Sequence, residues 1–233
     1  MDYMGDVKKN LEEVQERIEK AADRAGRNAD DIRLMAVTKV KPREIAEEAY
    51  RAGIRLFGEN RVQEAEEKYR DFHDDAELHI IGHLQTNKVK RIVGLASCVQ
   101  SIDKLKTAQE IEKRFEEADP IDVYLEFNTS GEESKSGYLR KERMFEDIEG
   151  MLHMKNLSIR GLMTIGPLTD DDAEIRSAFS FLRALFEETK SRYPQLPLEV
   201  LSMGMTSDYE AAIEEGATMV RIGSALFGSR EYG

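Results

Sequence analysis

The sequence holds a single cysteine, Cys98, among its 233 residues. One thiol cannot form an internal disulfide, so the composition gives no sign of an oxidising compartment. Because free cysteine is among the most buried residue types, we expect Cys98 to be a small buried side chain on a strand. The four histidines show no metal-ligand spacing such as an HExxH pair, so no metal site is predicted.

Long apolar runs are also missing. No stretch approaches the roughly 20 residues of a membrane span, and the polar, acidic start of the chain does not resemble a signal peptide. We therefore expect a cytoplasmic protein with no membrane partner. No linker rich in Pro, Gly or Ser interrupts the sequence, which favours a single domain over residues 1–233.

Basic residues are outnumbered, since 34 Lys and Arg face 46 Asp and Glu for a net charge of −12. An acidic surface favours solubility and argues against nucleic-acid binding. The short basic run Asn87–Arg91 is therefore interpreted as a solvated helix face. No long exposed apolar helix face stands out, so we expect a monomer. Any anionic ligand must be held by local geometry against the overall charge.

Short apolar runs alternate with amphipathic segments along the chain. The runs predict eight strands: Ile32–Val37, Leu56–Gly58, Leu78–Ile81, Cys98–Ile102, Ile121–Phe127, Ile159–Ile165, Leu198–Met203 and Met219–Ile222. The segments between them predict helices at Pro42–Gly53, Val62–Phe72, a stretch ending at Leu95, Lys104–Ala118, Met144–Met154, Asp171–Tyr193 and Asp208–Glu215. An extra helix, Asp6–Arg24, precedes the repeat and is expected to pack across the barrel.

Strict alternation of this kind predicts parallel strands joined by right-handed crossovers. Eight units favour an α/β fold closed as a single (β/α)8 TIM barrel, and an open doubly wound sheet is the alternative. Such barrels place the active site at the carboxyl ends of their strands. The residues that follow each apolar run are therefore the candidates for function.

Lys39 follows the first apolar strand. A lysine there would reach the barrel mouth partly dehydrated, which favours the neutral amine that attacks an aldehyde. The alternative is a solvent-exposed loop lysine, as we expect for Lys41. Asn60 and His83 also lie at strand ends and are candidate pocket residues, although His83 could equally cap the following helix.

The loops after strands seven and eight predict a phosphate site, because this fold usually holds phosphate there. Gly204 would let the backbone approach a ligand, and Ser207 with Glu210 resembles a capping box that leaves amides facing the mouth. Gly223 and Ser224 add a second turn of donors. The alternative is ordinary helix capping and a tight turn.

Arg221 interrupts the last apolar strand and shares a strand face with Gly223. A buried arginine needs a partner. That partner is either a carboxylate within the barrel or an acceptor atom on a ligand whose phosphate lies at Gly223 and Ser224.

The strand ends together resemble the pyridoxal 5′-phosphate (PLP) homeostasis proteins, a family similar to the barrel domain of bacterial alanine racemases. The matching segments are Ala36–Pro42, Phe57–Glu64, His79–Lys88, Asn128–Gly137, Gly161–Ile165, Leu201–Asp208 and Val220–Gly228. They run from the first strand to the C-terminus, and together they are specific although none is so alone.

The resemblance implies an alanine racemase N-terminal-like barrel that holds PLP as a Schiff base on Lys39. It implies phosphate contacts from Ser202, Met203, Gly204, Thr206, Ser207, Gly223 and Ser224, and an Arg221 that faces the pyridine nitrogen. A fixed cation there would keep that nitrogen unprotonated and restrain carbanion chemistry.

We therefore expect a protein that buffers PLP, or delivers it to apo-enzymes, without dedicated catalysis. The main alternative is an amino-acid racemase, which needs a second acid/base group on the other face of the substrate. The chain ends soon after strand eight, so we expect no further domain to supply that group. A third alternative is a Schiff-base aldolase acting on sugar phosphates. Lys135, in a Gly/Ser/Glu loop, is expected to be a solvated charge or a transient contact for the cofactor.

Overall fold

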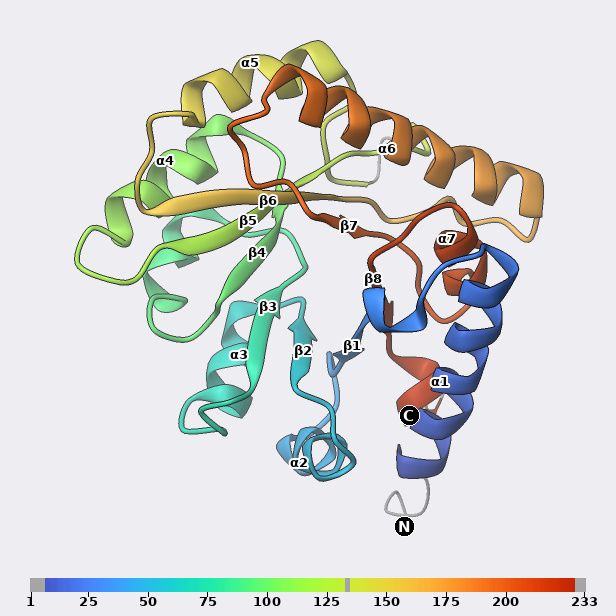
Figure 1. The fold of residues 1–233 in the computed structure, drawn as a ribbon. Helices are drawn as coiled ribbons and strands as arrows, with labels where there is room; N and C mark the ends of the chain where they lie inside the picture. Colours follow the sequence, from blue (N-terminus) through green and yellow to red (C-terminus); the bar gives the residue numbers. More distant parts are fainter. Residues whose placement is uncertain (1–6, 133–134, 229–233) are drawn as a thin grey trace.

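Eight parallel strands close into a barrel in the computed structural model, which describes residues 7–132 and 135–228 (Figure 1). The strands are β1 (Arg33–Val37), β2 (Leu56–Glu59), β3 (Glu77–Ile80), β4 (Cys98–Ile102), β5 (Ile121–Glu126), β6 (Leu157–Met163), β7 (Val200–Ser202) and β8 (Met219–Ile222). Each strand pairs with its neighbours in sequence, and β1 pairs with β8. This closure confirms the barrel over the open sheet.

Helices follow the strands and surround the barrel. They are α1 (Val7–Arg24), α2 (Arg43–Arg51), α3 (Val62–Tyr69), α4 (Leu105–Arg114), α5 (Lys141–Met151), α6 (Asp172–Arg192), α7 (Tyr209–Glu214) and α8 (Ser224–Phe227), with 3₁₀ turns η1 (Ala29–Asp31) and η2 (Thr86–Arg91). The predicted start of the first helix at Asp6 lies outside the described residues.

The apolar core has two layers because strand side chains alternate between the two faces of the sheet. The larger layer lies between the outer face of the barrel and the helices. The smaller fills the barrel interior with Met35, Leu56, Cys98, Tyr124, Met163 and Met219. Cys98 is buried on β4, as predicted.

The first helix does not pack across the barrel, and that prediction is wrong. α1 contacts α7, α8 and α2, and Asn10 Nδ2 donates to the Leu226 carbonyl at 2.9 Å. α8 has only four residues, too few to cover its sector, so α1 completes the outer ring there (Figure 1). Its buried face is Val7, Leu11, Val14, Ile18, Ala21 and Ala22.

The helix predicted after the third strand is instead the short 3₁₀ turn η2. Val89 and Ile92 are fully buried and three residues apart, a spacing that matches the three residues per turn of a 3₁₀ helix. Ile92 N donates to Val89 O at 3.1 Å, which is the matching hydrogen bond. Gly94 then takes a positive φ of 68° and ends the segment.

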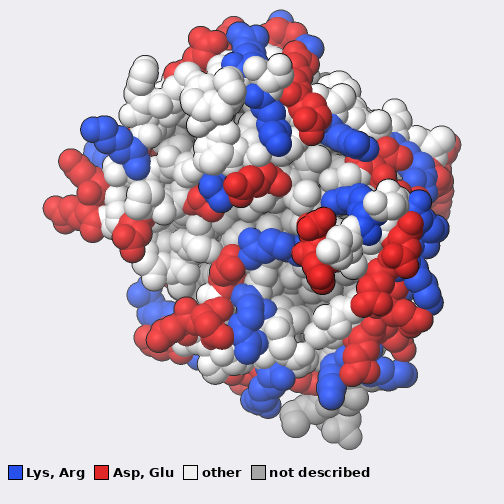
Figure 2. All heavy atoms as spheres, in the orientation of Figure 1, with Lys and Arg blue, Asp and Glu red and all other residues white. Residues whose placement is uncertain are grey.

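Charges of both signs are interspersed over the face shown in Figure 2, without one broad basic surface. Within the described residues, no helix combines the length and apolar character needed to cross a bilayer.

Replacement of Leu11 tests whether α1 is part of the barrel's outer ring. Leu11 is buried against the core, so we expect Leu11→Ala to lower the free energy of unfolding by about 2 to 4 kcal/mol. Glu12→Ala on the exposed face of the same helix should change it by less than about 0.5 kcal/mol. Urea unfolding measures both, and equal small effects would contradict the packing role of α1.

Candidate functional site

A cavity of about 1350 Å³ opens at the carboxyl ends of the strands. Its wall includes seven of the eleven predicted ligand residues: Lys39, Asn60, Thr206, Ser207, Arg221, Gly223 and Ser224. The other four, His83, Ser202, Met203 and Gly204, are not among the lining residues. The structure thus brings most of the predicted site together, and it places the rest behind or beside the wall.

The turn that carries Lys39 is held by side chains of α3. Val40, the next residue, has a φ of 59°, which is strained for a β-branched residue. Its amide donates to Glu64 Oε2 at 2.9 Å, and the Lys41 amide donates to the Thr38 carbonyl at 3.0 Å. These bonds fix the direction in which the chain leaves β1 and therefore place Lys39 at the cavity.

A buried charged cluster lies beneath this turn. Lys68 Nζ donates to the Thr38 carbonyl at 2.7 Å and to Glu59 Oε1 at 2.8 Å, and Thr38 Oγ1 donates to the same carboxylate oxygen at 2.7 Å. Burial raises the pKa of Glu59, although hydrogen bonds from Lys68 and Thr38 oppose that rise. Lys68 was not predicted as part of the site, because a lysine within the sequence pattern of a surface helix gives no sign that its side chain points inward.

Hydroxyl and amide groups gather where β7 and β8 end. Gly223 precedes α8, and the first amides of a helix have no acceptor within it. Thr206 Oγ1 accepts from the Ala225 amide at 3.3 Å, which joins the loop after β7 to α8. Ser207 and Ser224 are exposed at the same wall. Together these groups form a donor set of the kind that holds phosphate.

The predicted capping box of Ser207 and Glu210 is wrong. Asp208 occupies the N-cap of α7 and accepts from the Met205 amide at 2.6 Å. The Glu210 carboxylate is instead paired with Arg17 and Arg24 of α1. Two arginines from a distant helix compete for that carboxylate, and neither could be foreseen from the local pattern.

We had predicted that Gly204 lets the backbone approach a ligand, but Gly204 instead lies close to helix α7. It has a φ of 93°, and a Cβ added there would lie 2.6 Å from Ala212 Cβ. Met203 is completely buried. The backbone of this segment is therefore shaped by packing against α7, and only Met205, Thr206 and Ser207 reach the cavity wall.

Arg221 lies at the cavity wall and is only 4% exposed. Its Nη1 donates to Ser202 Oγ at 2.8 Å and its Nη2 donates to the Thr164 carbonyl at 2.7 Å. Its hydrogen-bond partners within the protein are thus a hydroxyl and a carbonyl, and the predicted carboxylate is not among them. Burial lowers the pKa of Arg221 to about 10, so the guanidinium stays charged at neutral pH.

His83 is outside the cavity wall. Its side chain is 43% exposed, and its Nδ1 lies 3.8 Å from Asp103 Oδ2. A lone histidine at a strand end therefore did not identify a lining residue. Among the residues described, no group of three or more His, Cys, Asp or Glu side chains could hold a metal ion, so the geometry offers no metal centre there.

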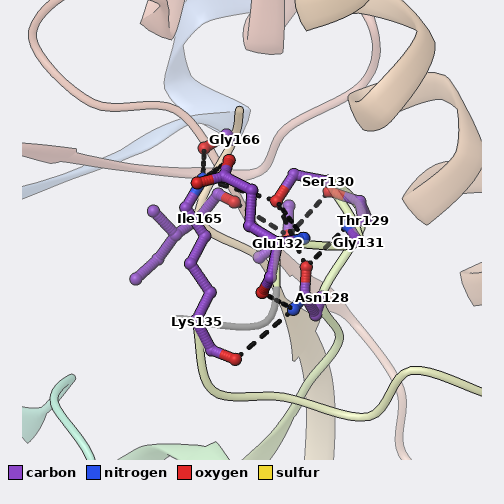
Figure 3. Close-up of polar contacts among 9 residues, drawn as sticks. Asn128, Thr129, Ser130, Gly131, Glu132, Lys135, Ile165 and Gly166 are labelled. Carbon is purple, nitrogen blue, oxygen red and sulfur yellow. Dashed lines mark hydrogen bonds and ion pairs between the residues drawn. The ribbon is translucent and has the colours of Figure 1, made fainter. Parts of the chain in front are cut away.

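Lys135 is partly buried, so the expectation of a solvated charge is wrong. Its side chain is 18% exposed, and its Nζ donates to Glu132 Oε1 at 2.5 Å and to the Gly166 carbonyl at 2.9 Å (Figure 3). Asn128 organises this turn, since its Oδ1 accepts from the Gly131 amide at 2.9 Å. Two residues of the same predicted segment, Glu133 and Ser134, lie outside the described residues.

Comparisons with known proteins agree with this geometry. The family model for the alanine racemase N-terminal domain matches residues 9–231. The pyridoxal phosphate homeostasis protein of Aquifex aeolicus is 45% identical over 224 residues, covering 95% of this chain and 97% of that protein. The protein of that name from Pseudomonas aeruginosa is 43% identical over 232 residues, with 99% and 98% coverage.

Solved structures show the same barrel. PipY of Synechococcus elongatus, with PLP bound, has a TM-score of 0.79 and 33% identity, covering 91% of this chain and all of that one. The alanine racemase of Clostridium difficile has a TM-score of 0.76 at 14% identity, and the match covers 57% of its length. The fold and site define a barrel of the alanine racemase N-terminal class. Within that class, the chain belongs to the pyridoxal phosphate homeostasis protein family.

Substitution of Gly204 separates packing from ligand contact. We expect Gly204→Ala to destabilise the protein by about 2 to 4 kcal/mol even without ligand, because positive φ and collision with Ala212 both oppose a Cβ. Gly53→Ala is the control, since Gly53 has a φ of 108° and no neighbouring atom within 4 Å. It should cost only the conformational part, about 1 to 2 kcal/mol. Equal losses in urea unfolding would contradict the packing interpretation.

Removal of Lys68 should show how much the buried Glu59 carboxylate lowers the free energy of unfolding when its ion-pair partner is absent. We expect Lys68→Met to lower the free energy of unfolding by about 3 to 5 kcal/mol near pH 8 and by less near pH 5. Without the ammonium, the already raised pKa of Glu59 rises further, so the folded state binds more protons than the unfolded state. Stability then falls as pH rises from the unfolded carboxyl pKa to the folded one.

Lys106→Met serves as the control for this change, because Lys106 is an exposed lysine on α4. Its substitution should alter stability by less than about 0.5 kcal/mol at both pH values. Urea unfolding at each pH measures the two variants. A loss in Lys68→Met that does not depend on pH would show that Glu59 is not the group left uncompensated.

Proposed function

We propose that this protein binds PLP at the barrel mouth, holds it as a Schiff base on Lys39, and serves PLP homeostasis by buffering or delivering the cofactor without dedicated catalysis. The observation that carries the proposal is the shared cavity. One cavity at the carboxyl ends of β1 and β8 is lined by Lys39, by the donors at Gly223 and Ser224, and by the buried cation Arg221.

The donor set fits the three chemical parts of PLP. Its aldehyde needs an amine, which Lys39 supplies. Its phosphate needs hydroxyl and amide donors, which Thr206, Ser207, Gly223 and Ser224 supply. Four basic side chains line the cavity, Lys39, Lys41, Arg51 and Arg221, against the two carboxylates Glu44 and Glu48. This local excess offsets the net charge of −12 and suits an anionic ligand.

The chemistry that PLP supplies when bound is a reactive aldehyde and an electron sink for carbanions. The chain supports the first property and weakens the second. Arg221 is a donor only and stays charged at neutral pH, so it cannot give a proton to a ring nitrogen and disfavours a proton there. A cofactor held against such a cation is suited to storage more than to amino-acid chemistry.

The lining residues also offer little for directed proton transfer. No tyrosine, histidine or cysteine occurs among the described residues that line the cavity. Glu44 and Glu48 belong to α2, and Glu44 is exposed to solvent, whereas a poised acid/base group needs a tuned environment. We therefore propose no racemase activity, and the alanine racemase likeness, at 14% identity, concerns the fold alone.

We further propose that apo PLP-dependent enzymes receive the cofactor and that the protein acts in the cytoplasm as a monomer. Ser207 and Ser224 are exposed at the cavity wall, which supports delivery, because another amine can approach an aldehyde bound there. The family name carried by relatives above 40% identity supports a role in homeostasis.

A visible absorption spectrum with added PLP tests the covalent site. We expect wild-type protein to show a Schiff-base band that borohydride fixes onto Lys39, and Lys39→Ala to lose it. Lys41→Ala is the matched control and should keep the band, because Lys41 Nζ donates to the Phe227 carbonyl at 2.9 Å. No band in wild type would refute the proposal, and a band that survives in Lys39→Ala would make Lys135 the next lysine to replace.

The same samples separate storage from catalysis. Racemisation of amino acids at roughly 1 s⁻¹ or faster would contradict the non-enzymatic role. Borohydride trapping of a sugar phosphate on Lys39 would favour the aldolase alternative.

A further inference from the structure

A continuous chain of polar side chains crosses the barrel interior from the cavity to the opposite rim. It starts at Arg221, whose Nη1 donates to Ser202 Oγ at 2.8 Å. Ser202 Oγ donates to Gln100 Oε1 at 2.6 Å. Gln100 Nε2 is 2.8 Å from His79 Nδ1. His79 Nε2 lies 3.7 Å from Glu77 Oε2 at the start of β3.

The donor and acceptor capacities give this chain a single direction. Arginine can only donate, so Ser202 must accept from it and has its own hydrogen left for Gln100 Oε1. The amide group of Gln100 then donates through Nε2 to His79 Nδ1. His79 therefore carries its hydrogen on Nε2 and turns it towards a carboxylate that can only accept.

The far end of the chain is anchored at the rim. Arg33 Nη2 donates to Glu77 Oε2 at 2.7 Å. His79 and Arg33 together lower the pKa of Glu77 to about 2, against the effect of its burial, so this acceptor is ionised. Burial lowers the pKa of His79 itself, which keeps the imidazole neutral and its Nδ1 free to accept from Gln100.

The surroundings make this arrangement costly to maintain. The interior around it is an apolar cluster that includes Met35, Tyr124 and Met219. Ser202 and Gln100 are completely buried, and a buried polar group left without a partner costs about 1 to 3 kcal/mol. Of the members of this chain, all of them described residues, Arg221 is the one that lines the cavity, so the chain reaches the site through the guanidinium.

We propose that Ser202, Gln100 and His79 are positioning residues, which hold the guanidinium of Arg221 in one orientation at the wall of the cavity. If PLP binds at the proposed site, the orientation of Arg221 decides how strongly the ring nitrogen of the ligand is recognised. This consequence rests on the proposed function. Ser202 accordingly acts through Arg221 and is not a phosphate contact.

The positioning itself can be measured without ligand. In ¹⁵N-labelled protein we expect slow rotation of the Arg221 guanidinium and a His79 ring with its hydrogen on Nε2; signals are assigned with Arg221→Lys and His79→Gln. Ser202→Ala and Gln100→Met should each release the guanidinium, which then rotates faster. Unchanged Arg221 signals in both variants would overturn the proposal whether or not PLP binds.

Thr189→Val is the matched control for these variants. Thr189 is completely buried like Ser202, but its hydroxyl donates to the Leu185 carbonyl within α6, at 2.6 Å. This variant loses a buried hydrogen bond without touching the chain to Arg221. It should therefore lose a similar amount of stability and leave the Arg221 signals as they are in wild type.

The consequence for the ligand is tested with PLP and its 1-deaza analogue, in which a C–H group replaces the ring nitrogen. Wild type and Thr189→Val should prefer PLP. Ser202→Ala and Gln100→Met should reduce that preference by about fivefold, which corresponds to one hydrogen bond of about 1 kcal/mol. A preference unchanged in both variants would overturn the link to the ring nitrogen, whereas absence of PLP binding in wild type would refute the proposed function and leave the ligand-free result to decide the positioning.

Discussion

The buried guanidinium of Arg221 is the constraint on which the rest of the site depends. Closure of eight parallel strands makes the inner face of β8 a dry interior, and the alternation that turns Met219 inward also turns Arg221 inward. A charge taken out of water is stable only if hydrogen bonds replace its hydration. Ser202 at the end of β7 and the carbonyl of Thr164, the residue after β6, provide them, so two neighbouring strand ends are committed to one side chain.

The turn that carries Lys39, at the other side of the cavity, is also held by side chains of a neighbouring element. Lys39 follows a turn whose strained Val40 is held by Glu64, while Lys68 and Glu59 satisfy each other beneath it. Arg221 and the turn that carries Lys39 are thus both placed by partners on neighbouring elements.

The sequence predicted what depends on local pattern and missed what depends on distant partners. The alternation of strands and helices was enough to predict the barrel. The polar residues at the strand ends were enough to predict that Lys39 and Gly223 lie at the cavity. The capping box failed because Arg17 and Arg24, about 190 residues away, pair with Glu210. The resemblance implied a phosphate contact from Ser202, but its position at the end of β7 turns its hydroxyl into the barrel, towards Arg221.

The same fold can hold the same cofactor for different functions, because function depends on the groups that surround the cofactor. Under the proposed function, the groups that would make a bound aldehyde catalytic are weak: a charged Arg221 beside the ring would oppose protonation of its nitrogen, and Glu44 on α2 is exposed to solvent. The groups that would hold the aldehyde and the phosphate under that proposal, Lys39, Gly223 and Ser224, all line the same cavity. A site that binds the cofactor but lacks a well-placed proton donor suits the proposed storage role, and the buried chain behind Arg221 would keep a charged group beside the ring.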